Sequence, residues 1–359
     1  MKTMDVHSKT HTYPIYIGFH LRKKMNELIK HPYSKIFIIT DENVASLYLQ
    51  DILDGLKDKQ VIYEILQQGE CSKTIETYYK LQTKALIREL DRNSLIIALG
   101  GGMVGDIAGF VAATFMRGID YIQMPTTILA HDSSIGGKVA INHERGKNLI
   151  GSFYTPKAVI YDIDMLKSLP QAEIRSGYAE IVKEALLANN ELFIRIMQTN
   201  LENLSTEQLI THIYDAIQIK KDIIELDEFE TSVRKHLNLG HTLGHALEAY
   251  FNYDRILHGE AVAIGLLFSL FISERYFQNK MPLRELYNWL LKNDYPLYFS
   301  QIDLVKLLQW MKLDKKRTND TINFVLLRSI EQPKVVSFSE EEILNDMKQF
   351  FAYLDGGNL

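Results

Sequence analysis

Histidine is concentrated between residues 231 and 260, which hold four of the eleven histidines of this 359-residue chain, namely His236, His241, His245 and His258. From Thr242 onward the run TLGHALEAYF has an apolar stripe at helical spacing. A helix that begins at Leu239 or Gly240 would place His241 and His245 on one face. Two imidazoles so placed form half of a zinc site, although the Glu that follows the first His in zincins is absent. His258 in the next segment would add a third ligand, so these residues indicate a metal site, with core or surface histidines as the alternative.

A second chemical signal is the apolar run SLIIAL (94–99), which leads directly into GGGMVGD (100–106) and an apolar helix. Gly100, Gly102 and Gly105 satisfy GxGxxG between a strand and a helix, so backbone N–H groups and a helix N-terminus could bind a pyrophosphate. The pattern departs from an ordinary Rossmann unit because the next strand, YIQM (121–124), ends in Pro125 instead of an acid. The ribose-binding carboxylate must then come from elsewhere. Asp41 and Glu70 are the candidates, and Asp41 could instead cap a helix.

The segment that follows is polar and rich in glycine. It contains DSSIGGK (132–138) and HERGKN (143–148). Lys138 and Lys147 beside flexible glycines are typical of a phosphate pocket, and the alternative is a solvated loop.

The composition is that of an ordinary soluble globular protein, with 46% hydrophobic and 24% charged residues. A net charge of −5 and the lack of a dense basic run argue against a nucleic-acid partner. The single cysteine, Cys71, excludes an internal disulfide and a cysteine-rich metal site. The N-terminus has no apolar signal segment, and the most apolar stretch, 261–273, is too short to span a bilayer. We therefore expect a cytoplasmic protein without a membrane partner.

The periodicity of the chain changes near Leu169 and Pro170. Before this point, strand-like runs at 13–17, 36–40, 61–66, 94–99, 121–124 and 157–162 are separated by helical segments, of which 21–30 and the one from 69–73 to about 90 are the clearest. After it, helical periodicity dominates until a hairpin-like pair at 322–327 and 334–338 and a C-terminal helix. We predict an α/β fold with a Rossmann-like dinucleotide-binding domain at 1–169 and a mainly α-helical metal- and substrate-binding domain at 170–359.

Nine motifs in a fixed order resemble 3-dehydroquinate synthase. They are GECSK (69–73), GGGMVGD (100–106), PTT (125–127), DSSIGGK (132–138), GKN (146–148), SGYAEIVK (176–183), RKHLNLGHTLGHALE (234–248), LHGEAV (257–262) and DKK (314–316). The resemblance extends from about residue 13 to the C-terminus. It implies an enzyme that converts the sugar phosphate 3-deoxy-D-arabino-heptulosonate 7-phosphate (DAHP) to 3-dehydroquinate in the shikimate pathway. It also implies NAD, one divalent metal (zinc or cobalt) and a homodimer.

The resemblance also implies a role for individual residues. The metal ligands would be Glu180, His241 and His258, and His245 would be a hydrogen-bonding or proton-transfer group instead of a ligand. The NAD contacts would be Asp41, Asn43, Glu70, Lys73, Gly102, Met103, Val104, Gly105, Asp106, Thr126, Thr127, Lys138 and Lys147, with Met165, Leu166, Lys167 and Ser168 nearby. The substrate groups would be Asp132, Lys138, Asn148, Lys183, Lys220, Arg234, Asn238, Lys315 and Lys316. Arg117 would reach the substrate phosphate of the partner subunit.

One departure from the family pattern is a segment, 129–131, that is one residue shorter than usual. Three alternatives remain at this point. Another sugar-phosphate cyclase would use the same machinery, but Arg234, Asn238 and the DKK segment favour a substrate that carries a carboxylate. A metal-dependent alcohol dehydrogenase would release NADH and would need fewer phosphate-binding lysines. A non-catalytic NAD sensor would not need an intact set of metal ligands.

Overall fold

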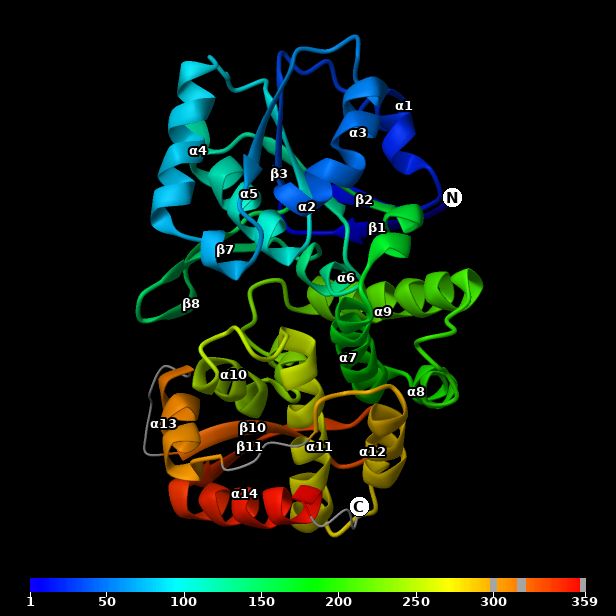
Figure 1. The fold of residues 1–359 in the computed structure, drawn as a ribbon, viewed down its shortest axis with the longest axis vertical. Coiled ribbons are helices and arrows are strands. Elements are labelled where there is room, and N and C mark those ends of the chain that lie inside the picture. The colour runs from blue at the N-terminus through cyan, green and yellow to red at the C-terminus, as the bar shows by residue number, and fades with distance from the viewer. Residues whose placement is uncertain (298–301, 315–320, 356–359) are drawn as a thin grey trace. The chain divides into compact units, whose positions relative to one another are not determined.

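The structure, a computed structural model, describes residues 1–297, 302–314 and 321–355. It forms two compact units (Figure 1). Unit 1 comprises Met1–Leu169 together with Ile224–Phe229, and unit 2 comprises Pro170–Ile223 and Glu230–Leu359. The α/β class with a helical C-terminal half, predicted from the sequence, is confirmed.

Unit 1 is built on a seven-stranded sheet in the order β1-β2-β9-β6-β5-β3-β4. Within this sheet, only β1 runs antiparallel to its neighbour. The strands are β1 (Lys2–His7), β2 (Thr12–Gly18), β3 (Ile36–Asp41), β4 (Val61–Leu66), β5 (Leu95–Gly100), β6 (Asp120–Pro125) and β9 (Ala158–Asp162). All residues of β3, β5 and β9 are buried, as expected for parallel strands that are covered on both faces.

Helices cover both faces of this sheet. On one face, α4 (Ile75–Ile87) and α5 (Gly102–Thr114) pack in a core cluster that includes Phe37, Ile96 and Ala98. The other face is covered by helical segments whose buried residues cluster with Ile38, Ile97 and Ile160. Those segments are a 3-10 turn (Leu21–Lys24), α1 (Met25–Leu28), α2 (Glu42–Val44), a π-helical turn (Ala45–Leu49) and α3 (Gln50–Gly55). The alternation of side chains along each strand therefore produces two separate hydrophobic cores.

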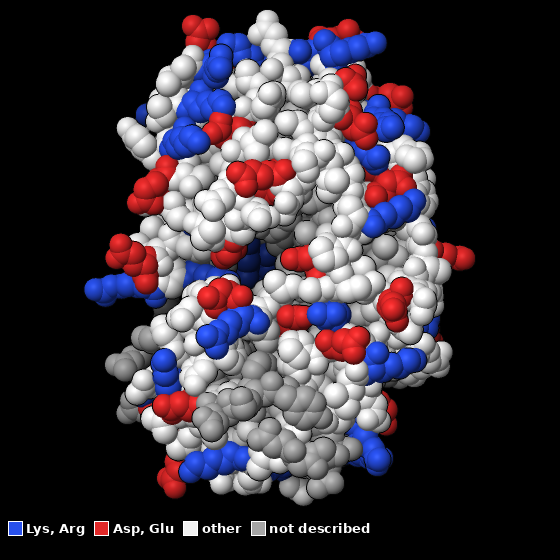
Figure 2. Space-filling model, viewed as in Figure 1, with Lys and Arg blue, Asp and Glu red and all other residues white. Residues whose placement is uncertain are grey.

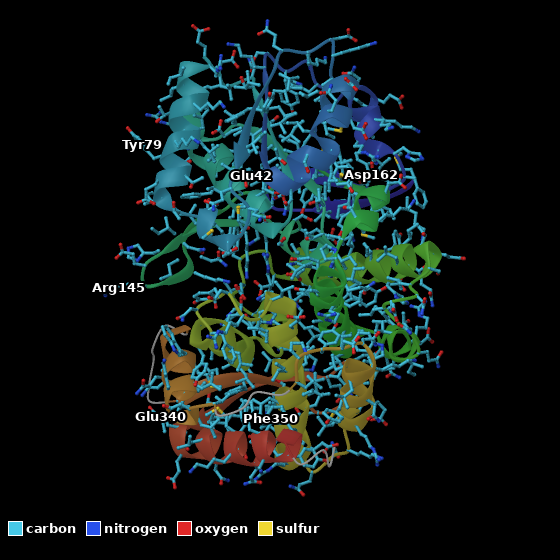
Figure 3. The ribbon with its side chains drawn as sticks, viewed as in Figure 1. Glu42, Tyr79, Arg145, Asp162, Glu340 and Phe350 are labelled. Carbon is cyan, nitrogen blue, oxygen red and sulfur yellow. The ribbon has the colours of Figure 1, made fainter. Side chains whose placement is uncertain are left out.

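Three parts of unit 1 differ from the sequence-based expectation. Strand β1 was not expected, although Met4 and Val6 are buried in it and alternate with exposed residues. The helix expected at 21–30 is a 3-10 turn followed by one α-helical turn. The polar segment 132–148, for which no strand was expected, contains the end of α6 (Ala130–Ser133), strand β7 (Lys138–His143) and the start of β8 (Gly146–Phe153). These strands form an antiparallel hairpin whose tip carries Arg145 (Figure 3).

The segment 224–229 belongs to unit 1 although it lies between two stretches of unit 2. Glu225 accepts a hydrogen bond from the backbone N–H of His7, and Glu228 accepts one from that of Lys9, each at 2.7 Å. The ring of Phe229 contacts the ring of Phe153 edge to face. Contacts between residues more than 200 positions apart have no signal in a single sequence, so the boundary at 169/170 did not anticipate this segment.

Unit 2 is mainly helical. Its helices are α7 (Gln171–Ala188), α8 (Asn190–Met197), α9 (Thr206–Leu226), α10 (His241–Tyr250), α11 (His258–Phe277), α12 (Leu283–Lys292), α13 (Leu304–Asp314) and α14 (Glu340–Asp355), with a 3-10 turn at Val233–Asn238. The predicted hairpin is present as β10 (Thr321–Leu327) paired with β11 (Pro333–Ser339). Most of α11 is buried, and it packs against α7, α10, α12 and β10, so it is the central helix of this unit.

Among the described residues, no helix combines the length and the apolar composition needed to cross a membrane. On the face drawn in Figure 2, lysine and arginine side chains are interspersed with aspartate and glutamate.

The buried histidine of α9 leads to a prediction about stability. His212 Nδ1 lies 3.1 Å from the hydroxyl of Tyr178, and burial, followed by the charge of Arg195, lowers the pKa of His212 from 6.5 to about 4. The folded protein thus favours the neutral ring. This preference stabilises the fold above pH 6.5 and is lost as the pH falls toward 4, at a cost of roughly 3 kcal/mol at most. Urea unfolding of His212→Asn, which cannot titrate, should show a flatter decline between pH 6.5 and 4.5.

Tyr178→Phe provides the control, because it removes the hydroxyl and leaves the buried ring of His212 in place. It should lower the free energy of unfolding by a similar amount at every pH. An unchanged pH profile in His212→Asn would contradict the prediction.

Candidate metal centre and cofactor loop

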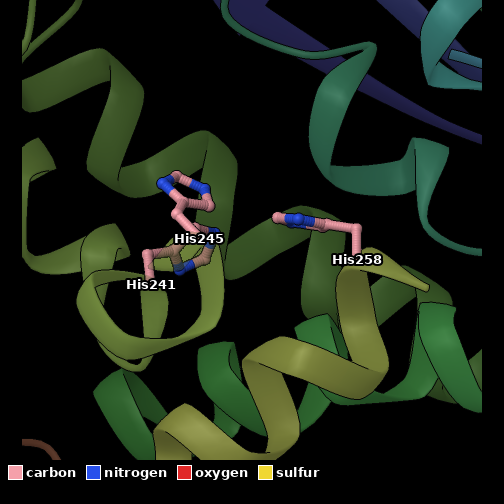
Figure 4. Close-up of side chains that lie close together, drawn as sticks. All are labelled: His241, His245 and His258. Carbon is pink, nitrogen blue, oxygen red and sulfur yellow. The ribbon is translucent and has the colours of Figure 1, made fainter. Parts of the chain in front are cut away.

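Three imidazoles converge in unit 2 (Figure 4). His241 and His245 lie on α10, and His258 is the first residue of α11. One nitrogen of each ring lies within 4.8 Å of the others, and the ring centroids are 5.1 to 5.7 Å apart. The one-face arrangement predicted from the HxxxH spacing is therefore present, and helix packing adds the third ring.

The first turn of α10 is positioned by glycines. Gly240, which precedes the helix, has φ +80°, a left-handed conformation that favours glycine. A Cβ on Gly265 of α11 would lie 1.9 Å from the carbonyl oxygen of Gly240, so only a glycine allows the two backbones to approach this closely. This contact fixes the start of α10, and hence His241, against α11.

Glu180 of α7 adds a carboxylate to the three rings. Its Oε1 lies 3.5 Å from His241 Nε2 and 3.4 Å from His258 Nε2, and its Oε2 contacts the ammonium of Lys183. Glu180 and Lys183 are both almost fully buried. Oxygen and nitrogen ligands that share a tetrahedral zinc ion lie about 3.4 Å apart. Glu180 Oε1 thus has the spacing of a shared ligand toward both His241 and His258, and one nitrogen each of His241, His245 and His258 lies within 4.8 Å of the others, so these four side chains could hold one divalent ion.

Hydrogen bonds behind the rings orient two of the imidazoles. His258 Nδ1 lies 2.9 Å from Glu248 Oε2, and His241 Nδ1 lies 3.2 Å from the carbonyl oxygen of Leu239. If Nδ1 of each ring carries the proton and donates it, the lone pair of each Nε2 is free on the side that faces Glu180, where a metal ion could bind. Partners of this kind fix the tautomer and the orientation of metal-binding histidines. The donor set therefore fits a metal ion in its ring orientation as well as its spacing.

The electrostatics of the cluster favour a cation next to Glu180. Burial lowers the pKa of His241 to about 3, so this ring is neutral, as a ligand must be. Burial also disfavours the charged form of His258, but Glu248 and Glu180 outweigh it and raise the pKa to about 10. His258 thus favours a proton between these two carboxylates, and a divalent ion bound to its Nε2 would take the place of that proton.

A close contact between α7 and α11 sets the distance from Glu180 to His258. The backbone N–H of Gly259 donates to Ser176 Oγ at 3.0 Å, and a Cβ on Gly259 would lie 1.8 Å from the carbonyl oxygen of Ser176. Arg175 contacts Glu260, which also accepts from the N–H of Leu257 at 3.2 Å. These contacts hold the N-terminus of α11 directly on α7.

The glycine-rich loop of unit 1 has the predicted strand–turn–helix context. It joins β5 to α5, whose first turn carries no acidic residue. A Cβ on Gly105 would lie 2.7 Å from Gln123 Oε1, and one on Gly102 would lie 3.1 Å from Ser133 Oγ. The glycines thus allow the first turn of α5 to pack closely against β6 and α6. The backbone N–H groups at such a helix N-terminus can bind a pyrophosphate.

Polar residues gather near this loop. Lys73 is buried and contacts Asp106 and the side chain of Asn148, while Glu70 lies 3.6 Å from its ammonium. Burial alone would lower the pKa of Lys73, but Asp106 and Glu70 outweigh it and raise that pKa. Asp41 caps α2 by accepting from the N–H of Val44 at 3.0 Å, which is the capping role weighed from the sequence.

The other predicted cofactor residues lie on several elements of unit 1. Asn43 donates to Gln68, Thr127 Oγ1 accepts from the N–H of Ala130, and Lys167 donates to Asp164. Met165 and Leu166 are buried in a 3-10 turn (Ile163–Ser168), where Tyr48 contacts Ser168. The remaining ones are placed as follows: Met103, Val104 and Asp106 in α5, Thr126 buried after β6, Lys138 at the start of β7 and Lys147 in β8.

The predicted substrate residues of unit 2 are mostly buried cations. Lys183 on α7, Lys220 on α9 and Arg234 in the 3-10 turn are each at most 5% exposed. Asn238 donates to Glu230 at 3.0 Å. In unit 1, Asp132 lies in α6, Asn148 in β8 and Arg117 is exposed after α5. Lys315 and Lys316 lie outside the described residues.

Two positioning residues were given no role from the sequence. Glu248 lies seven residues after His241 and three after His245, so helical periodicity could have placed it on the same side of α10. Ser176 has no comparable signal, because its importance arises only from the approach of Gly259, more than 80 residues away.

Comparisons with known proteins point to the same family through family models and through overall sequence identity. Family models described as "3-dehydroquinate synthase N-terminal" and "3-dehydroquinate synthase C-terminal" match residues 63–176 and 177–317. A 3-dehydroquinate synthase from Oceanobacillus iheyensis is 52% identical over 357 residues, which cover 99% of both chains.

Two solved structures of synthases share the fold. A 2-deoxy-scyllo-inosose synthase complexed with carbaglucose-6-phosphate, NAD+ and Co2+ is 26% identical, with a TM-score of 0.88 over 97% of this chain and 100% of that one. A 2-epi-5-epi-valiolone synthase from Streptomyces hygroscopicus with NAD+ and Zn2+ bound is 22% identical, with a TM-score of 0.84 over 98% of each chain.

The contact between Glu248 and His258 predicts an effect on metal affinity. Loss of such a partner typically weakens metal binding by about 10- to 100-fold. Glu248→Ala should therefore weaken zinc binding, measured by competition with a chromogenic chelator, by about this factor. Glu248→Gln keeps an oxygen acceptor without the charge and should lie between wild type and Glu248→Ala. Equal zinc affinity in all three proteins would show that this hydrogen bond does not orient a ligand.

Proposed function

The chain belongs to the 3-dehydroquinate synthase family, and from this premise we propose how its residues convert DAHP to 3-dehydroquinate and phosphate. The observation that carries the proposal is the buried cluster of Glu180, His241 and His258, which has the spacing and ring orientation of a divalent metal site. The glycine loop after β5, in unit 1, supports a dinucleotide as the second cofactor.

We propose that Glu180, His241 and His258 hold one divalent ion, zinc or cobalt, and that the loop 102–106 with Glu70 and Lys73 holds NAD. When bound, NAD removes and returns a hydride, and the metal acts as a Lewis acid on substrate oxygens. The two related cyclases with NAD+ and Co2+ or Zn2+ support this pair of cofactors. The conversion is redox-neutral, so the protein must keep the same NAD through the cycle.

The residues of the chain would orient the substrate and move its protons. Lys183 and Lys220 are buried ammonium groups, and burial strengthens their attraction to anionic oxygens. Arg234 presents a planar fork that matches a carboxylate in two hydrogen bonds. His245 of α10 lies beside the rings of the proposed ligands and would accept or donate a proton during the reaction. Asp132, Lys138, Asn148 and Asn238 would complete the polar surroundings of the substrate.

Other reactions on the same scaffold are less well supported. A cyclase for a substrate without a carboxylate would not need Arg234, and the 52% identity is to a 3-dehydroquinate synthase. An alcohol dehydrogenase would convert NAD to NADH stoichiometrically. A sensor without catalysis would not need a complete set of metal ligands.

Phosphate release from DAHP tests the function directly. Purified, metal-loaded protein with a catalytic amount of NAD should release phosphate in large excess over NAD without lasting absorbance from NADH. Release from another sugar phosphate but not from DAHP would retain the scaffold and reject the substrate. Net NADH formation with an alcohol would point to a dehydrogenase.

Two histidine variants separate the possible ligand sets. His258→Ala should lose bound metal and activity together, because it removes a ligand. His245→Ala should retain metal and turn over slowly, since it removes a proton-transfer group whose contribution is typically about 10²- to 10⁴-fold. Metal content measured by plasma emission spectroscopy and kcat measured by phosphate release decide between them. Metal loss in His245→Ala would instead support a three-histidine site.

We further propose a homodimer in which Arg117 serves the partner's substrate. Arg117 is exposed and follows α5 in a left-handed conformation, with φ +69°. Arg117→Ala and His258→Ala should each be inactive alone. After subunit exchange, the Arg117→Ala subunit of a mixed dimer keeps its metal ligands and receives Arg117 from its partner, so about a quarter of wild-type activity should return. Absence of recovery, with subunit exchange verified, would place Arg117 in its own subunit's site.

A further inference from the structure

Asn142 has an unusual position in the hairpin of β7 and β8. Asn142 faces a bulge of β8, because the pairing register shifts between Ile141 and His143 and leaves three residues of β8, 147–149, opposite Asn142 alone. Its backbone N–H turns away from β8 and donates to the carbonyl oxygen of Lys73 at 2.8 Å. Bulges disrupt the local ladder, and Asn142, opposite this one, contacts the segment that contains Glu70 and Lys73.

The side chain of Asn142 makes two further hydrogen bonds. Its Nδ2 donates to Glu70 Oε1 at 2.8 Å, and its Oδ1 accepts from the backbone N–H of Asn148 at 3.0 Å. Lys73 donates to the side-chain oxygen of Asn148 and lies 3.6 Å from Glu70 Oε1. Glu70, Asn142, Asn148 and Lys73 thus form a closed ring of polar contacts.

This ring holds Asn148 in a defined conformation. Asn148 has φ +57°, a left-handed backbone that asparagine tolerates but does not generally prefer. Its backbone N–H is held by Asn142 and its side-chain oxygen by Lys73. Without Asn142, one of these two restraints is lost, and most of the strand that carries Asn148 is exposed.

We propose that Asn142 is a positioning residue that links the cofactor carboxylate of Glu70 to the substrate residue Asn148. This inference rests on the proposed function, which assigns Glu70 to NAD and Asn148 to the substrate. Asn142 touches neither ligand. It acts through the two residues that do, so binding of NAD at Glu70 and binding of substrate at Asn148 depend on the same amide group.

Two substitutions at Asn142 separate its two hydrogen bonds. Asn142→Ala removes both. Asn142→Asp is nearly isosteric and keeps an oxygen acceptor for the N–H of Asn148, but it places a second carboxylate against Glu70. Asn142→Asp should therefore weaken NAD binding and leave the KM for DAHP near the wild-type value, whereas Asn142→Ala should raise both the Kd for NAD and the KM for DAHP.

A hydrogen bond of this kind corresponds to about a tenfold change in affinity. We expect the Kd for NAD, measured by titration calorimetry on the metal-loaded protein, to rise about tenfold in both variants. The KM for DAHP should rise about tenfold only in Asn142→Ala, with kcat at saturating NAD and DAHP within about twofold of wild type. Hydrogen exchange should show faster exchange of the Asn148 amide in Asn142→Ala alone.

A reciprocal exchange tests the contact with Glu70. When Glu70→Gln is combined with Asn142→Asp, the new glutamine amide can donate to the new aspartate carboxylate, which restores the hydrogen bond with its polarity reversed. The NAD penalty of Asn142→Asp should therefore vanish when it is measured relative to Glu70→Gln alone. A hairpin residue that only stabilises the fold would show no such rescue and no separation between the Kd for NAD and the KM for DAHP.

Glu144→Gln, at the exposed tip of the same hairpin, is the matched control and should resemble wild type in every measurement. Unchanged Kd and KM in Asn142→Ala, or an undiminished penalty in the double variant, would overturn the inference. Wild-type turnover of DAHP is the reference for all the variants. Its absence would reject the proposed function, whereas a failure of the variant pattern with normal wild-type turnover would reject only the role of Asn142.

Discussion

The buried carboxylate of Glu180 is the constraint on which the structure of unit 2 depends. A carboxylate that is withdrawn from water costs several kcal/mol unless opposite charges or hydrogen-bond donors surround it. Lys183 lies one helical turn away on α7, but His241 and His258 come from two other helices. The three helices must therefore meet at this point. Gly259 and Gly265 permit that meeting, because a side chain at either position would separate the backbones.

Unit 1 has a different fold but also contains a buried charge that other elements compensate. Lys73 is buried, and its charge is compensated by Asp106 and Glu70, which lie on separate elements. The parallel sheet brings the ends of its strands to one edge, which is where open α/β sheets place their ligands. The hairpin of β7 and β8 then adds Asn142 and Asn148 to this edge from a region outside the main sheet. Each unit thus carries a polar cluster in which side chains from several elements compensate a buried charge.

Such clusters suit a reaction in which a hydride is removed and later returned. The cofactor must stay in place through the cycle, and the metal must keep positions available for the substrate, so both sites need rigid supports. Synthases with other names share the fold, and the scaffold alone therefore does not define a substrate. Substrate choice must depend on individual side chains, and the buried guanidinium of Arg234 is the group best suited to recognise a carboxylate.

The sequence by itself determined the buried strands, the periodic helices, the glycine loop and the HxxxH pair, because each of these signals lies within a few consecutive residues. It did not determine strand β1, the hairpin in 132–148 or the attachment of 224–229 to unit 1. Resemblance to a family suggested Glu180, but only the tertiary structure placed its carboxylate between two imidazoles and put Glu248 behind His258. It also decided that Asp41 caps a helix. The physical reason is that Glu180, Glu248 and His258 lie on three different helices, whose approach depends on how they pack, whereas the Asp41 cap is a local contact that the sequence had left open beside another role.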